Sequence, residues 1–143
     1  YDIDILPFNG EEYYGASGEM AYLQSLGETP ISLMINIDSP GHKGSKIAIS
    51  TYNFSESMLE QTSFLLAESQ NVERGGEWFA GDHAPFLFSQ IPCMAVCSSD
   101  FFDGGLAHTN TAKDTLDEVD IPLLKDSALF LTDFLSRFDP QES

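Results

Sequence analysis

Two adjacent carboxylates are the most chemically suggestive feature of this sequence. Glu11 and Glu12 stand side by side in FNGEEYYGASGE, directly after an apolar run that predicts a strand. Neighbouring carboxylates rarely reach the same atom, so such a pair can divide its work. One side chain can bind a metal, while the other takes a proton from metal-activated water and returns it to a leaving amine. A lone glutamate pair at a strand end is also common in a solvated loop.

Further oxygen and nitrogen donors follow other predicted strands. Asp38 ends the apolar stretch ISLMINID, and His108 lies in the loop after the last predicted strand. Carboxylate and imidazole groups are ligands that zinc prefers. Two alternatives stay open at this point: Asp38 could be a turn-forming residue before SPG, and His108 could be a surface histidine.

A second acidic residue and histidine stand together in GDHAPF. Asp82 and His83 resemble a site pair, although His83 could act only by orienting other groups through hydrogen bonds. The third histidine, His42, lies in the turn PGHKG, and we expect its side chain to be exposed.

The two cysteines do not suggest nucleophilic catalysis. Cys93 and Cys97 lie in IPCMAVCSS, which predicts a buried strand, and four strand residues span roughly 13 Å. A disulfide tolerates only about 7 Å between Cα atoms, so we expect free thiols, which favour a reducing compartment such as the cytoplasm. Buried thiols without a neighbouring histidine are poor nucleophiles. The sequence GASGE does not form a nucleophile elbow either, because Gly18 directly follows Ser17.

Strands and helices must bring these donors to one place. Apolar runs predict four strands, at residues 2–8, 31–38, 46–51 and 91–99. The second run is continuously apolar, which is typical of a central strand. Helical spacing predicts a helix that starts at Ala16 and ends at Gly27, a second helix capped by Ser55, and a closing helix. The expected buried stripe of the closing helix is Leu124, Ala128, Leu131, Leu135 and Phe138.

Alternating strands and helices over all 143 residues predict one α/β domain, a three-layer sandwich with a mainly parallel central sheet. Sites in such folds gather at the carboxyl ends of the strands, and the donors above follow strands, so we expect a single site. Two long loops, residues 74–86 and 101–120, would surround it. Four aromatic residues in or beside the first loop could line an apolar pocket or belong to the core: Trp78, Phe79, Phe86 and Phe88.

Charge and hydropathy exclude two classes of partner. With 23 acidic and 6 basic residues, the net charge of −17 opposes binding to a phosphate backbone, so nucleic acid is not an expected partner. The acidic surface suits metal cations or a substrate with a free ammonium group, and it also favours solubility. No apolar run is long enough to cross a bilayer, so no membrane partner is expected.

Four segments, taken together, resemble the co-catalytic zinc aminopeptidase family, which includes bacterial leucyl aminopeptidases and has glutaminyl cyclases among its relatives. They are FNGEEYYGASGE, MINID at 34–38, GDHAPFLFSQIP at 81–92 and HTNTAKDTLDEVD at 108–120. Their order matches the family, and they extend over nearly the whole chain. The resemblance implies the same α/β sandwich, a phosphorylase/hydrolase-like fold.

The resemblance also implies a role for each residue. Glu11 would be the general base and Glu12 a zinc ligand, shared on the first zinc with His108. Asp38 would bind a second zinc, and Asp82 and His83 would lie near the substrate pocket. The implied reaction is hydrolysis of the first peptide bond of a peptide with a free N-terminus, by water that two zinc ions activate.

Two departures from the family change what we expect of the chain. In the family, a histidine and a bridging aspartate come from segments before the glutamate pair, and this chain begins too late to contain them. We therefore expect residues 1–143 to be the C-terminal portion of one catalytic domain without its N-terminal strands, to bind zinc poorly and to be inactive alone. The open sheet edge would need an upstream segment or a second copy of the chain. The spacing from His108 to Asp114 is also longer than in the family.

Two other functions remain open on the same scaffold. One is a glutaminyl cyclase-like transferase, which uses a single zinc. The other is a non-catalytic binding or dimerisation domain, against which the intact Glu11, Glu12, Asp38 and His108 argue.

Overall fold

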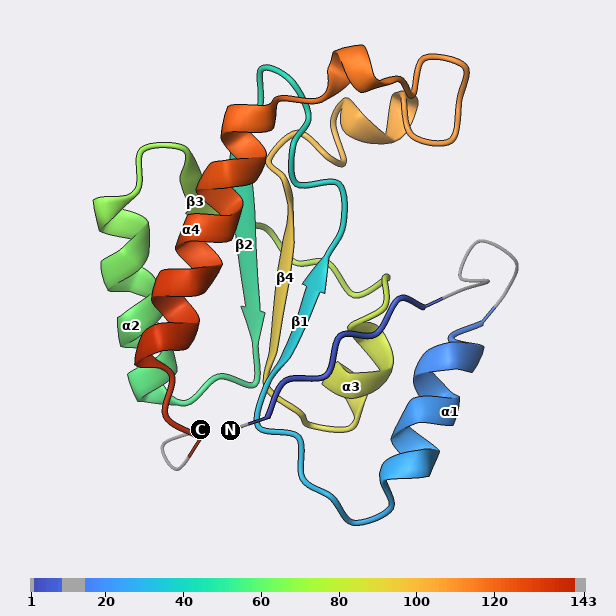
Figure 1. Ribbon diagram of the computed structural model, residues 1–143, viewed down its shortest axis with the longest axis vertical. Coiled ribbons are helices and arrows are strands. Elements are labelled where there is room, and N and C mark those ends of the chain that lie inside the picture. Colours follow the sequence, from blue (N-terminus) through green and yellow to red (C-terminus); the bar gives the residue numbers. More distant parts are fainter. Residues whose placement is uncertain (1, 9–14, 141–143) are drawn as a thin grey trace.

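Four strands form one sheet in the computed structural model, which describes residues 2–8 and 15–140. The strands are β1 (Met34–Ile37), β2 (Ile47–Tyr52), β3 (Val72–Arg74) and β4 (Cys93–Ser98). Their order in the sheet is β1-β4-β2-β3 (Figure 1). The β1–β4 and β2–β3 pairs are parallel, and β2 runs antiparallel to β4. The mainly parallel sheet that the sequence predicts is therefore confirmed.

The two central strands present different side chains to the two faces of the sheet. All six residues of β4 are buried, as its unbroken apolar sequence predicts. On one face, Ile47, Ile49 and Val96 belong to the largest hydrophobic cluster. On the other, the short side chains of Ala48 and Ala95 leave room for large aromatic groups. The alternation follows from the two-residue period of a strand.

Two long helices cover the face with the large aliphatic side chains. They are α2 (Glu56–Glu68) and α4 (Ile121–Arg137), which lie side by side in Figure 1. The Ser55 hydroxyl accepts a hydrogen bond from the Met58 N–H and caps α2, as predicted. The Asp120 carboxylate caps α4 in the same way, through the Leu123 N–H. Both caps satisfy N–H groups that have no partner inside the helix.

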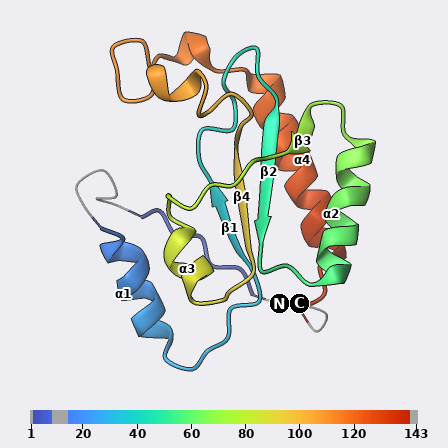
Figure 2. The ribbon, with the colours of Figure 1, turned by 180° about the vertical axis from the view of Figure 1, so that it is seen from behind.

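Two shorter helices and an aromatic loop cover the opposite face (Figure 2). They are α1 (Ser17–Leu26), which is followed by Gly27 as predicted, and α3 (Ala84–Phe88). Phe86 of α3 is buried and its ring lies 6.3 Å from that of Tyr22 in α1. Helices on both faces of the sheet make the three-layer sandwich that the sequence predicts. No helix in the described residues is long and apolar enough to span a membrane.

Two predictions about the strands are wrong. Residues 2–8 form no strand, because they make no ladder with any described neighbour, and Ile3 and Ile5 are exposed. Without that neighbour, β1 is an edge strand of the described sheet and not a central one, and its Ile37 side chain is 56% exposed. An alternating sequence gives a strand only where a partner can accept its hydrogen bonds.

Two other details differ from the sequence-based prediction. The short strand β3 and the short helix α3 were not predicted, because each has too few residues for a periodic pattern. Helix α4 is correct and Phe138 is buried as predicted, but the other four positions of the buried stripe are displaced by one residue from the predicted ones. The buried residues of α4 and its C-terminal cap are Leu123, Ser127, Phe130, Phe134 and Phe138.

Candidate functional site

The carboxyl ends of β1 and β4 place two polar loops at the same edge of the sheet. The strands are parallel, and the Asp38 N–H, just after β1, donates to the Val96 carbonyl. The loop after β4 runs from Ser99 to Asp120 and includes two short 3₁₀ turns, Gly105–Ala107 and Leu116–Glu118. The sequence predicts this long loop correctly.

The end of β4 holds the turn that follows β1. The Ser98 hydroxyl donates to the Ser39 carbonyl and accepts the His42 N–H at 2.9 Å. Gly41 lies against the start of α4, where a Cβ atom would come within 2.7 Å of Leu124 Cδ2. A larger residue at this position would force the Leu124 side chain to move, so glycine lets the turn lie against the end of the long loop.

Backbone hydrogen bonds join the turn to residues that are more than 70 positions away. The Lys43 N–H donates to the Glu118 carbonyl at 2.9 Å, and the Asp120 N–H donates to the Gly41 carbonyl at 2.8 Å. Between them, His42 forms an antiparallel bridge with Val119. His42 is therefore held by the backbone next to Glu118.

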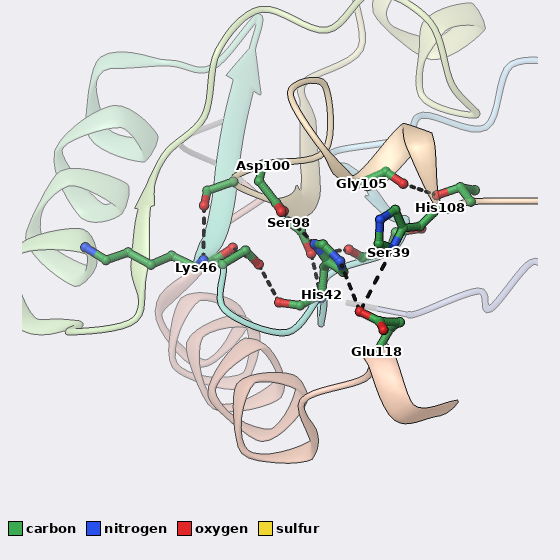
Figure 3. A network of polar contacts seen from close by, with 11 residues as sticks. Ser39, His42, Lys46, Ser98, Asp100, Gly105, His108 and Glu118 are labelled. Carbon is green, nitrogen blue, oxygen red and sulfur yellow. Dashed lines mark hydrogen bonds and ion pairs between the residues drawn. The ribbon is translucent and has the colours of Figure 1, made fainter. Parts of the chain in front are cut away.

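His42 lies at the centre of a cluster of four side chains (Figure 3). Its Nδ1 atom is 2.6 Å from Asp100 Oδ2, and its Nε2 atom is 3.8 Å from Glu118 Oε2. The same Glu118 oxygen is 3.9 Å from His108 Nδ1. The two imidazole rings meet edge to face with 5.5 Å between their centroids. We call His42, Asp100, His108 and Glu118 the His–Glu cluster.

Three residues of this cluster offer donor atoms that could hold a metal ion. One donor atom each from His42, His108 and Glu118 lies within 4.8 Å of the others. His108 Nδ1 is buried and has no hydrogen-bond partner in the described residues. Two imidazoles and a carboxylate form a donor set that proteins use for zinc.

The structure places the residues predicted to form the site as follows. Asp38 and His108 come to the same edge of the sheet, as their positions after parallel strands predict. The Asp38 carboxylate accepts a hydrogen bond from the Ser39 hydroxyl at 3.0 Å, and His108 joins the His–Glu cluster. Glu11 and Glu12 lie outside the described residues.

The expectation of an exposed His42 is wrong. Its side chain is 19% exposed, because the ring packs against His108 and bonds Asp100. Sequence reasoning did not identify Asp100 or Glu118 as site residues either. For His42 a signal was present, since it follows the carboxyl end of a strand just as Asp38 does.

His83 is fully buried, and its hydrogen bonds define which of its two ring nitrogens carries the proton. Its Nε2–H donates to the Trp78 carbonyl at 2.7 Å, and its Nδ1 accepts from the Asn36 amide at 3.3 Å. Its ring stacks on Tyr52 at 5.4 Å. Burial lowers the pKa of His83, while the Trp78 carbonyl and the Asp38 charge oppose that shift in part. His83 is thus held neutral and fixes the loop around Trp78.

We expect the free energy of unfolding to fall as the pH is lowered below about 6.5, where the unfolded His83 takes up a proton. Because its folded-state pKa is lowered, the native state binds fewer protons than the unfolded state in this range. One such proton contributes a slope of at most about 1.4 kcal/mol per pH unit. Urea unfolding between pH 8 and 5 measures the slope.

The matched variant for this prediction is His83→Gln, which keeps a polar side chain and removes the titration. Its stability should change less steeply with pH than that of the parent chain, since every other titratable group is the same in both proteins. Equal slopes in the two proteins would contradict the assignment of this proton to His83.

Asp82 and four aromatic residues border this region. Asp82, Glu19, Pro85 and Phe88 help to line a hollow of about 570 Å³ between α1 and α3. The sequence left open whether the four aromatic side chains line a pocket or belong to the core, and the structure places two in the core and two at the surface. Trp78 and Phe86 belong to the core, whereas Phe79 and Phe88 are 52% and 71% exposed.

Both cysteines are free and buried, as predicted. Burial raises the pKa of the Cys93 thiol to about 12. Burial also raises the pKa of Cys97 to about 11, with smaller contributions from the negative charges of Asp38 and Asp100. Neither thiol forms a thiolate at neutral pH, which agrees with the absence of thiol chemistry expected from the sequence.

Comparisons with known proteins identify the relatives of this fold. The sequence matches Peptidase family M28 over residues 1–135. Its fold is similar to that of the Legionella pneumophila LapA aminopeptidase, at 18% identity and a TM-score of 0.69, over 87% of this chain and 36% of that one. It is also similar to an aminopeptidase from Aneurinibacillus sp. strain AM-1, at 20% identity and a TM-score of 0.70, over 91% of this chain and 32% of that one.

These solved structures support the fold alone at such identities. The chain spans about a third of the length of each of them. No curated protein matches the chain.

Proposed function

Since this chain belongs to peptidase family M28, we propose that it carries the base and metal ligands of a zinc-dependent aminopeptidase. The match over residues 1–135 is the observation that carries the proposal. The fold shared with two bacterial aminopeptidases supports it. The substrate class would be peptides with a free N-terminus, and the net charge of −17 favours the approach of their ammonium group.

Four residues would hold the metals and move the proton. We assign Glu12, Asp38 and His108 as zinc ligands and Glu11 as the general base. The placement of Asp38 and His108 at one sheet edge and the unpartnered, buried His108 Nδ1 support a cation site there. Nitrogen and carboxylate oxygen donors fit zinc.

The reaction would use the protein's own groups for proton transfer and positioning. Zinc, when bound, supplies a Lewis acid that polarises the peptide carbonyl and acidifies water. Glu11 would accept the proton of the attacking water and return it to the amine that leaves. His83, fixed between Trp78 and Asn36, would hold the loop that carries Asp82 beside the bound peptide.

Hydrolysis of an amino-acid 4-nitroanilide tests this proposal. We expect release of nitroaniline that depends on zinc, stops on chelation and returns when zinc is restored. A glutaminyl peptide is assayed in parallel, because cyclisation of that substrate without nitroanilide cleavage would favour the cyclase-like alternative. The solved relatives are about three times as long, so the assay includes the chain and any longer natural form that contains it.

Activity towards neither substrate, in a folded protein with zinc bound, would contradict both enzymatic assignments. The same scaffold would then be better described as a binding or dimerisation domain.

A further inference from the structure

The His–Glu cluster contains a complete set of three metal donors within the described residues. His42 Nε2 and His108 Nδ1 are 3.8 and 3.9 Å from the same Glu118 oxygen. Two donors on a tetrahedral zinc, with bonds of about 2.0–2.1 Å, are separated by roughly 3.3 Å. Each histidine–Glu118 pair would therefore have to close by only about half an ångström, and the donor atoms of the two histidines already lie within 4.8 Å of each other.

Asp100 prepares His42 for this role. The 2.6 Å contact lets His42 Nδ1–H donate to Asp100 Oδ2, and the lone pair is then on Nε2, the atom that faces Glu118. A carboxylate behind a histidine fixes the tautomer and raises the basicity of a metal-binding imidazole in this way. Without a metal, an Nε2 lone pair beside a carboxylate oxygen gains no hydrogen bond.

The negative charges of Asp100 and Glu118 also favour a bound cation. In the described part of the chain, Asp100 and Glu118 form ion pairs with the two histidines and with no lysine or arginine. When both imidazoles are neutral, the cluster carries two negative charges. A divalent ion balances them, and two imidazoles favour zinc or a similar transition metal over magnesium or calcium.

We propose that His42, His108 and Glu118 form a zinc site, with Asp100 positioning His42. The site shares His108 with the proposed aminopeptidase centre, but it uses His42 and Glu118 where that centre uses Glu12 and Asp38. All three of its ligands lie between residues 42 and 118. The chain therefore binds one zinc ion through a two-histidine, one-carboxylate set, in contrast to the weak binding expected from the sequence.

Zinc titration of the chain by calorimetry, with cobalt substitution as a spectroscopic readout, tests the site. The expected result is one ion per chain and a cobalt spectrum typical of low coordination number. His42→Ala and Glu118→Gln should each weaken binding more than Asp100→Asn, for which a loss of about 10–100-fold is expected. Asp117→Asn, on the exposed neighbour of Glu118, is the matched control and should bind zinc like the parent.

Glu12→Gln and Asp38→Asn separate this inference from the proposed function. Both should leave the affinity for this ion unchanged. If they abolish binding while His42→Ala and Glu118→Gln keep it, the His–Glu site is refuted and the aminopeptidase ligand set is supported. Absence of zinc binding by the folded parent chain would also refute the site.

Nuclear magnetic resonance of the parent chain keeps the test independent of any variant that fails to fold. On addition of zinc, the ring nitrogens of two histidines should shift and those of His83 should not, because His83 is bonded to Trp78 and Asn36. Unchanged ring signals for His42 would overturn the proposal.

Discussion

Glu11→Gln is expected to reduce aminopeptidase turnover by roughly 10²–10⁴-fold, the usual contribution of a general base. The amide keeps the size of the side chain but cannot accept the proton of the attacking water. Zinc content should not change, because Glu11 is assigned to proton transfer and Glu12 to the metal. Steady-state hydrolysis of a nitroanilide, combined with metal analysis of the same sample, measures both effects.

Two control variants make this result specific. In a form of the protein that hydrolyses the nitroanilide, Glu12→Gln should lose activity and the zinc of the aminopeptidase centre but not the ion of the His–Glu cluster, which distinguishes a ligand from a base. Glu28→Gln removes a carboxylate from an exposed position just after α1 and should keep full activity. If Glu11→Gln retained activity within a few-fold of the parent, the assignment of Glu11 as base would be wrong.

Phe134→Ala is expected to destabilise the fold by about 3–5 kcal/mol, the usual cost of removing a buried phenylalanine. Phe134 is fully buried where α4 meets α2 and the sheet, and its ring stacks on Phe54 and Phe138 at 6.1 and 6.2 Å. A domain of this size is stable by only about 5–15 kcal/mol, so much of its stability would be lost. Urea unfolding followed by circular dichroism gives the difference.

Leu129→Ala on the same helix is the matched control. Leu129 is 52% exposed, so its truncation should change the free energy of unfolding by no more than about 0.5 kcal/mol. If instead Leu129→Ala proved more costly than Phe134→Ala, helix α4 would have to present its other face to the sheet.

That comparison also tests a detail that the sequence left ambiguous. Helix α4 was predictable because its apolar residues repeat at helical spacing, but IPLLKDSALFLTDFLSRF contains two overlapping apolar stripes one residue apart. Periodicity cannot choose between Leu131 and Phe130 as the buried position. Packing chooses the larger aromatic rings, which fill the space between α4 and the sheet.

Strand prediction succeeded where burial on both faces left a strong local signal, as in β4. It failed for residues 2–8, where the alternating pattern is present but the described chain supplies no hydrogen-bonded neighbour. Local sequence reports the preference of a segment, whereas a strand is a property of two segments together.

The same distinction applies to the candidate site. Asp38 and His108 could be selected because each follows a strand, and the parallel β1–β4 pairing brings their loops to one edge. His42 and Glu118 become neighbours only through the pairing of residues 41–43 with residues 118–120. No sequence motif within either segment predicts the contact between His42 and Glu118.

The backbone pairing of these two distant loops has a consequence for the order of folding. Closing a chain segment of this length is slow compared with forming helices such as α2, since contacts between remote residues come after local ones. We therefore expect the turn at His42 to pair with residues 118–120 after the helices have formed. Zinc binding by the His–Glu cluster would therefore come late in refolding. A spectroscopic signal from the bound metal would appear after the circular dichroism signal of the helices.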